Sequence, residues 1–331
     1  MKTSPPLVSI LLNNYNYGRY LRDAINSALS QTYPNFEVIV VDDGSSDSSR
    51  EIIATYGSRV ISVLKENGGQ GSAFNAGFAA SKGEWIHLLD SDDVLCANTL
   101  ERILEMATAH PLAGLIAHNV SYCTENRTPM DYLPPPIRHC HLVDDRRGAR
   151  RGRLTALLPA TSGLCVRRDV LAGILPMPEE IRITADAYLR VVAASLTPIL
   201  LLPEPLAIQR IHGLNLFTLA NEDKGKDALF RCTSIHAVIT FHLRKEHPSL
   251  SRLAWKQYGY LLYQFMACRT KESRKVERDI RNRYSVLEWN PLCILLVFGV
   301  FAKRFVNGLF INIVHSSHRH YDRWPAVPQA R

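Results

Sequence analysis

Short apolar runs alternate with helical patterns over residues 7–95, and this alternation constrains the fold more than any other feature. Between the runs, apolar side chains recur with the period of a helix, as in residues 20–29. The runs themselves are typical of buried strands and lie at residues 7–12, 36–41, 59–64 and 85–89. The pattern predicts an α/β fold, with a doubly wound, mostly parallel sheet covered by helices on both faces.

Clustered carboxylates follow two of these predicted strands. Asp42 and Asp43 come after the second strand, and Asp90, Asp92 and Asp93 come after the fourth. Because ligands of such sheets bind at the carboxyl ends of the strands, we expect the two groups to face one edge. Carboxylates suit Mg²⁺ or Mn²⁺, which keep water and substrate phosphates among their ligands. A solvated acidic turn is the alternative interpretation of the same residues.

Residues 67–77 (NGGQGSAFNAG) combine a glycine-rich turn with a predicted helix start near the same edge. The N-terminus of a helix suits a diphosphate, because its N–H groups point outward and its dipole favours negative charge. The first strand is not followed by GxGxxG, and the chain contains no GxxxxGK[ST]. A dinucleotide-dependent dehydrogenase and a P-loop enzyme are therefore disfavoured.

The regular alternation stops after a predicted strand at 113–120. Residues 124–160 contain three consecutive prolines and five arginines between Arg146 and Arg153, and they predict a long loop or insertion. We expect these arginines to form a loop over phosphates or an acidic sugar.

Ordered structure is expected to resume over 161–169, and a helix is expected over about 185–196. We predict an α/β domain over 1–220 and a mainly helical region over 221–331. Within that region, the apolar run 292–302 has too few residues to span a bilayer, and Lys303 and Arg304 interrupt the longer segment 292–314. It predicts either a buried helix or an interfacial helix on an anionic membrane surface.

The net charge of +8 is compatible with nucleic acid, an anionic membrane or a phosphorylated substrate. No nucleic-acid-binding module is recognisable, so nucleic acid is not an expected partner. The seven cysteines are dispersed without metal-type spacing, and the N-terminus lacks the pattern of a signal peptide. We expect a cytoplasmic protein, with peripheral attachment to the inner face of the membrane as the alternative.

Two stretches, VSILLNNYNYGRYLRDAINSALSQTYPNFEVIVVDDGSSDSS and ENGGQGSAFNAGFAASKGEWIHLLDSDD, resemble the N-terminal half of family 2 glycosyltransferases. The resemblance runs from about residue 7 to 95 and continues more weakly to about 215. It implies a GT-A fold and an inverting, metal-assisted transfer of a sugar from a nucleoside-diphosphate sugar, most often a UDP-sugar. The acceptor would be a hydroxyl of a saccharide or a lipid-linked acceptor, in the assembly of cell-surface polysaccharide or glycan.

The resemblance also implies roles for individual residues. Asp42 matches an aspartate that contacts the nucleotide base, with Asp43 beside it, and Tyr15 matches a wall against the base. Asp90 and Asp92 match the D-x-D motif, whose first aspartate lies near the ribose and whose second binds the metal.

Gly68, Gly69 and Asn75 match the glycine-rich segment under the nucleotide. Arg210 and His212 match a later R-x-H-x-x-N motif, in which the histidine would reach the metal or the diphosphate and Arg210 would neutralise the diphosphate. The alternative for His212 is a loop histidine packed against the domain.

Asp186 matches the general base of the family, which deprotonates the acceptor hydroxyl. Family members usually carry Glu-Asp at this point, and here Ala185 replaces the glutamate. The alternative role for Asp186 is an acidic residue favoured by the dipole at a helix start. Two alternative functions remain open: a non-catalytic nucleotide-sugar-binding accessory protein and a nucleotidyltransferase, although NNYNYGRY does not resemble the first loop of the latter.

Overall fold

A computed structural model describes residues 5–130, 137–156, 158–213, 215, 239–240, 242–254 and 256. Most of the predicted region 221–331, including the segment 292–314, lies outside the described residues. Among the described residues, no helix combines the length and the apolar character needed to cross a membrane.

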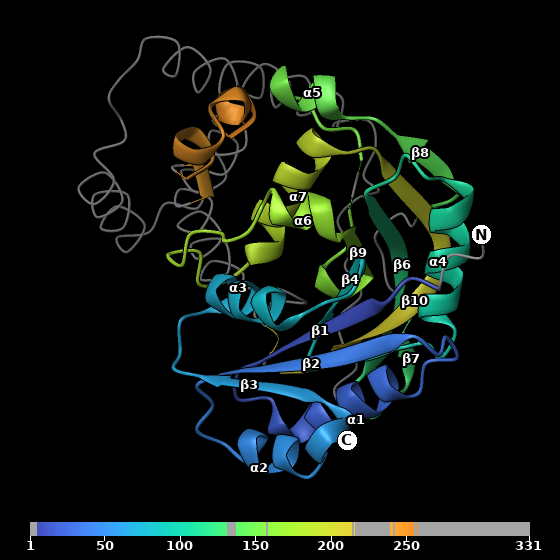
Figure 1. Ribbon diagram of the computed structural model, residues 1–331, viewed down its shortest axis with the longest axis vertical. Helices are drawn as coiled ribbons and strands as arrows, with labels where there is room; N and C mark the ends of the chain where they lie inside the picture. The colour runs from blue at the N-terminus through green and yellow to red at the C-terminus, as the bar shows by residue number, and fades with distance from the viewer. Residues whose placement is uncertain are drawn as a thin grey trace, which may run out of the picture.

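Four parallel strands form the first half of a single sheet (Figure 1). Their order is β3-β2-β1-β4, so the chain starts in the middle of this half and builds outward in both directions. In the register, Asn13 pairs with Asp90 and Asn14 pairs with Asp42, so polar residues end the central strands side by side. The bounds are β1 (Val8–Asn14), β2 (Phe36–Asp43), β3 (Ile61–Lys65) and β4 (Trp85–Asp90).

The second half of the sheet is mixed. β9 (Leu164–Arg167) lies antiparallel between β4 and β6 (Leu115–Thr124). β10 (Ile199–Ile211) then runs parallel to β6, and the short β5 (Val94–Leu95) pairs with it antiparallel. The predicted doubly wound, mostly parallel sheet is confirmed, with β9 as an antiparallel insertion.

Helices cover both faces of the sheet (Figure 1). Burial alternates along β1, where Leu11 belongs to the core on one face and Ile10 and Leu12 belong to the core on the other. The Leu11 face is covered by α3 (Gln70–Ala80), α5 (Arg146–Arg150), α6 (Arg168–Ala172) and α7 (Ala185–Leu196). The opposite face is covered by α1 (Gly18–Leu29), α2 (Ser49–Ala54) and α4 (Thr99–Ala109).

One local prediction differs from the structure. Within 124–160, the described residues include β7 (Pro129–Met130) and β8 (His141–Val143) as well as α5, and the two strands pair with β6 and β10. Ser48 precedes α2 but makes no capping hydrogen bond with its side chain. The Asp47 carboxylate instead accepts a hydrogen bond from the N–H of Ser49, at 3.0 Å.

Candidate active site

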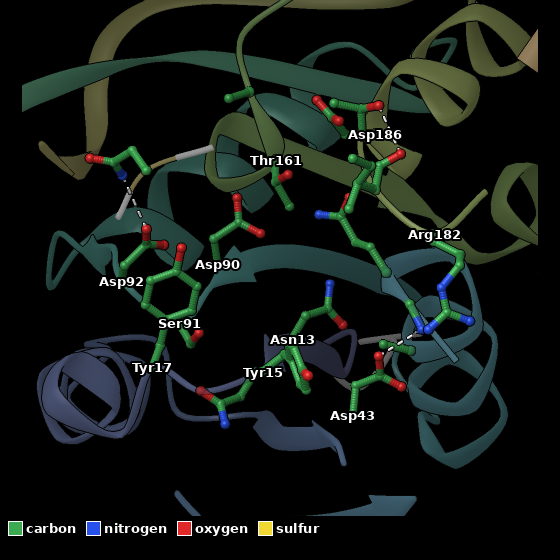
Figure 2. A pocket seen from close by; sticks show the side chains of 18 of the residues that line it. Asn13, Tyr15, Tyr17, Asp43, Asp90, Ser91, Asp92, Thr161, Arg182 and Asp186 are labelled. Carbon is green, nitrogen blue, oxygen red and sulfur yellow. Dashed lines mark hydrogen bonds between the residues drawn. The ribbon is translucent and has the colours of Figure 1, made fainter. Parts of the chain in front are cut away.

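A cavity of about 560 Å³ opens where β1, β2 and β4 end, between these strand ends and the start of α7 (Figure 2). The strands contribute side chains that follow the last buried apolar residues, as expected at the carboxyl edge of a parallel sheet. Its wall includes Asn13, Tyr15, Tyr17, Asp43, Gly69, Gln70, Asp90, Asp92, Thr161, Arg182, Asp186 and Arg190.

Asn13 is a cavity residue whose buried side-chain amide makes no hydrogen bond with any described residue. It is 8% exposed, and neither its amide nitrogen nor its amide oxygen has a hydrogen-bond partner. Figure 2 shows its side chain pointing into the cavity. Because an unpaired buried amide is costly, the arrangement fits a polar ligand that supplies the missing bonds. Tyr15, which is 48% exposed, lines the cavity beside it and can offer a ring face to a planar group.

Asp43 organises the glycine-rich turn. Its carboxylate accepts hydrogen bonds from the N–H groups of Gly68 at 2.9 Å and Gly69 at 2.7 Å, and it pairs with the Lys65 ammonium at 2.7 Å. Gly69 has a φ of +88°, and an added Cβ would lie 2.5 Å from the Cα of Arg182. The turn is therefore glycine-rich because backbone meets backbone at this edge of the cavity.

The N–H groups at the start of α3 are already used. Gln70 and Gly71 donate to the carbonyl oxygens of Arg182 and Ile181, at 2.7 and 3.1 Å. The predicted seat for a diphosphate on this helix N-terminus is therefore closed by the 181–182 segment.

Four predicted nucleotide contacts do not line the cavity, namely Asp42, Gly68, Asn75 and Arg210. Asp42 is fully buried and is enclosed by Asn14, Ser45 and Arg50, at 2.8 to 3.1 Å. Its neighbour Asp43 is the cavity residue, because successive side chains of a strand point to opposite faces. Asn75 forms two 2.8 Å hydrogen bonds with the backbone of Met177, and Gly68 contacts Asp43 rather than the cavity.

The three carboxylates after β4 separate into two groups. Asp90 and Asp92 line the cavity. Asp93 turns into the protein, where it accepts hydrogen bonds from the Ser162 hydroxyl at 2.6 Å and the Arg210 N–H at 3.1 Å. The Ser162 hydroxyl also accepts a bond from the N–H of Asp90. Asp93 thus ties the acidic turn to the residues before β9 and to β10.

Burial and like charge act together on this turn. Burial, followed by the neighbouring charges of Asp92 and Asp186, raises the pKa of Asp90 to about 8. The same surroundings raise the pKa of Asp93, first through burial and then through Asp92 and Asp90. Carboxylates held in this way favour a cation, which would remove the repulsion between them.

The residues of the R-x-H-x-x-N motif, Arg210, His212 and Asn215, contact the acidic turn that follows β4. His212 places Nε2 3.1 Å from Asp92 Oδ2, and the Asn215 amide lies 3.3 Å from the same oxygen. Arg210 pairs with Asp23 at 2.9 Å and lies over the Tyr20 ring, and its side chain is 7% exposed. Neither His212 nor Arg210 lines the cavity, so the predicted direct contact of Arg210 with a diphosphate is not supported.

The guanidinium groups of Arg182 and Arg190 line the cavity, and sequence reasoning missed both. Arg182 is exposed and donates to the side-chain oxygen of Asn67. Figure 2 shows it on the side of the cavity occupied by Asp43. A cation on this wall can neutralise an anionic group that enters the cavity.

Asp186 lies in the first turn of α7 and lines the cavity opposite the strand ends (Figure 2). Its carboxylate pairs with Arg190 at 3.1 Å, and Arg190 also donates to the Leu158 carbonyl at 2.9 Å. Ala185 is fully buried, and its N–H donates to the Gln70 side chain at 2.9 Å. The residue in place of the usual glutamate therefore packs in the core and does not reach the cavity.

The fit of a divalent metal depends on Asp90 and Asp92. Among the described residues, no three His, Cys, Asp or Glu side chains gather into a metal-binding group, so the predicted set of Asp90, Asp92 and His212 is not a closed cage. The two carboxylates, their mutual repulsion and the adjacent cavity fit an open site that Mg²⁺ or Mn²⁺ would complete with water and phosphate oxygens. His212 and Asn215 would then orient Asp92.

Comparison with solved structures defines the class of fold. The chain superposes on S. aureus TarS 1–349 in complex with UDP with a TM-score of 0.59, 18% identity and coverage of 97% of this chain and 94% of TarS 1–349. The same protein in complex with UDP-GlcNAc gives a TM-score of 0.55, also at 18% identity, with coverage of 98% and 95%. The predicted GT-A fold is confirmed.

Sequence comparison identifies the family. Residues 9–171 match the family described as "Glycosyl transferase family 2", and the chain belongs to this family. An uncharacterized glycosyltransferase of Nostoc sp. is 38% identical over 214 residues, which cover 63% of this chain and 66% of that protein. Glycosyltransferase GlyG of Streptococcus pneumoniae is 37% identical over 120 residues, 35% of this chain and 40% of GlyG. The chain thus aligns with less than two thirds of these relatives.

Proposed function

We propose that this protein is a metal-assisted, inverting glycosyltransferase that uses a nucleoside-diphosphate sugar, with UDP as the nucleotide. The observation that carries the proposal is the cavity itself, which joins Asp43, Asp90 and Asp92 on one side to Asp186 on the other. The complexes of TarS with UDP and UDP-GlcNAc support the choice of donor. The acceptor is proposed to be a hydroxyl of a saccharide or a lipid-linked saccharide.

Different residues of the cavity would bind the donor and activate the acceptor. Asn13, Tyr15 and Asp43 would hold the base and ribose through the amide, the ring face and the carboxylate. Arg182 would pair with the diphosphate, which keeps the leaving group in line. Asp90 and Asp92 would hold a Mn²⁺ or Mg²⁺ ion, which supplies positive charge for the departing diphosphate when bound.

Asp186 would take the proton from the acceptor hydroxyl, because its carboxylate reaches the cavity from the wall opposite the nucleotide. Arg190 would keep that carboxylate in place through its ion pair. Attack by the hydroxyl on the anomeric carbon then forms the new glycosidic bond as the bond to the diphosphate breaks, which inverts the configuration.

The first test is thermal unfolding with UDP, GDP and dTDP, with and without Mn²⁺. A ligand that binds the native state raises the unfolding midpoint. We expect UDP with Mn²⁺ to raise the midpoint of the wild type, and Asp92→Ala to abolish the rise. Glu51→Ala, which removes an exposed carboxylate on α2, is the matched control and should keep it. Absence of any nucleotide effect in the wild type would refute the proposal.

Turnover is tested next, by release of UDP from UDP-GlcNAc and other UDP-sugars with a panel of saccharides. The proton NMR coupling of the product's anomeric proton then distinguishes inversion from retention. Nucleotide binding without turnover on any donor and acceptor would favour the non-catalytic accessory protein.

A further inference from the structure

A second cavity, of about 420 Å³, lies apart from the active site and is lined by cations. Its walls include Arg151, Arg153, Arg252 and Lys256, and none of these four residues lines the active-site cavity. Two come from the arginine-rich segment and two from a segment about a hundred residues later in the chain. The sequence does not indicate that these segments meet.

A tight turn after α5 builds this basic cavity. Gly152 has a φ of +75°, and the N–H groups of Gly152 and Arg153 donate to the carbonyls of Ala149 and Gly148, at 2.9 and 2.8 Å. The left-handed glycine reverses the chain, so that Arg151 and Arg153 flank it.

The same glycine lets the later segment approach. An added Cβ on Gly152 would lie 3.0 Å from Arg252 Cγ and 3.1 Å from Lys256 Cδ. The Lys256 ammonium donates to the Gly152 carbonyl at 3.2 Å. The four cations therefore come together because the Arg252 and Lys256 side chains pack against Gly152, and not because opposite charges attract them.

The positive charge of this cavity is not neutralised by the described part of the chain. Among the described residues, no Asp or Glu carboxylate oxygen lies within 4.0 Å of a guanidinium nitrogen of Arg151, Arg153 or Arg252. Arg146, in the same segment, differs because it pairs with Asp144 at 2.6 Å. Like charges gathered without a counter-charge create a local potential that attracts anions.

We propose that the basic cavity binds a phosphate-bearing anion. Three guanidinium groups and one ammonium offer more donors than a single carboxylate can accept, whereas a phosphate or diphosphate group presents several oxygens to planar guanidinium forks. The phosphate could belong to a soluble compound or to the headgroup of an anionic phospholipid. The proposal is independent of the function of the active-site cavity.

The test measures binding of inorganic pyrophosphate by calorimetry, in EDTA, so that a metal at the active site does not contribute. We expect saturable binding that weakens with salt and is at least about tenfold weaker in Arg252→Glu. Arg147→Glu makes the same change of charge at an exposed residue of α5 outside the cavity, and should change the affinity by less than about twofold. Arg151→Gln repeats the test with a milder substitution.

A second arm uses sedimentation with vesicles of phosphatidylcholine alone or mixed with phosphatidylglycerol. Binding to the mixed vesicles that is lost in Arg252→Glu but kept in Arg147→Glu supports a lipid headgroup, and pyrophosphate binding with the same pattern supports a soluble phosphate. Failure of both probes, or equal losses in both variants, overturns the proposal. Stabilisation by UDP and Mn²⁺, measured in parallel, reports on the active-site cavity separately.

Discussion

The two sides of the active-site cavity are built in different ways. The strand-end wall (residues 13–15, 43 and 90–92) consists of side chains that directly follow buried strands. The α7 wall (residues 160–161 and 182–190) comes from loop segments and one helix start. The register of β1, β2 and β4 positions the first wall, whereas hydrogen bonds to α3 from the 177–185 segment position the second.

The two walls would serve different steps: the strand-end wall would bind the nucleotide and the metal, and the α7 wall would carry the base needed for turnover. The strand-end wall carries the groups that fit a nucleotide and a metal, and the sheet holds them rigidly. The α7 wall carries the proposed base and is attached through a few contacts with the glycine-rich turn. Arg182 is the exception, because its backbone belongs to the α7 wall while its side chain lies on the Asp43 side of the cavity. Substitution of Asp186 should therefore leave nucleotide binding nearly intact.

The largest effect is expected for Asp186→Asn. Loss of the proposed base should lower the turnover number by about 10³-fold, within the usual range for general base catalysis. The rise in unfolding midpoint caused by UDP and Mn²⁺ should stay near that of the wild type. Asp169→Asn, which alters an exposed aspartate on α6, is the matched control. Loss of nucleotide binding in Asp186→Asn would show that the two walls do not act separately.

Gly69→Ala tests the junction between the walls. The new methyl group would collide with the Arg182 backbone, and residue 69 would keep a positive φ, so we expect a loss of about 2–4 kcal/mol in unfolding free energy. Gly57 also has a positive φ but has open space around its Cα. Gly57→Ala should therefore cost only about 1 kcal/mol in the same denaturant titration. Equal losses would argue against close packing at the junction.

Asp42→Asn tests whether Asp42 stabilises the fold rather than contacting the nucleotide. Burial would raise the pKa of Asp42, but hydrogen bonds from Arg50, Ser45 and Asn14 outweigh it and hold the pKa below its usual value. The unfolding free energy should fall by about 1–3 kcal/mol at pH 7, with little change in nucleotide affinity.

The pH dependence of this effect has a definite sign. A carboxylate whose pKa is lowered on folding stabilises the protein above its unfolded pKa, and this contribution is lost as the pH falls. The difference between wild type and Asp42→Asn should therefore shrink below about pH 4. A difference that stayed constant down to pH 2–3, measured by urea unfolding, would contradict the assignment.

Asn13→Ala should give the smallest effect. The amide has no partner to lose in the free protein, so the unfolding free energy should change little. The affinity for UDP should fall by up to about tenfold, which corresponds to one or two hydrogen bonds. The neighbouring Asn14→Ala should lower the unfolding free energy, because the Asn14 amide donates to Asp42 at 2.9 Å. A destabilised Asn13→Ala with unchanged UDP affinity would remove Asn13 from the site.

Much of the strand-end wall could be predicted because motif and strand are adjacent in the chain. Asp43, Asp90 and Asp92 follow apolar runs, and parallel strands bring their ends together. The sequence did not separate two neighbours: Asp42 was assigned to the base, whereas Asp43 is the one that lines the cavity. Asn13 is the penultimate residue of β1 and pairs with Asp90 in the register, and the sequence signal for it is its place directly after the first apolar run.

The α7 wall could be predicted only in part. The helix over 185–196 agrees with α7, and Asp186 lies at the cavity. Arg182 was missed because nothing in its local pattern shows that its backbone would dock on Gly69 and Gln70. Arg210 was assigned to the diphosphate from its motif, although its pairing with Asp23 turns it away.

The sequence by itself determined the GT-A sheet, the family and the acidic edge, because strand periodicity and short motifs act over neighbouring residues. The tertiary structure decided which of two adjacent aspartates enters the cavity, which arginine accompanies it, and that Arg151 and Arg153 meet Arg252 and Lys256. These outcomes depend on contacts between residues far apart in the chain, and no local pattern encodes such contacts.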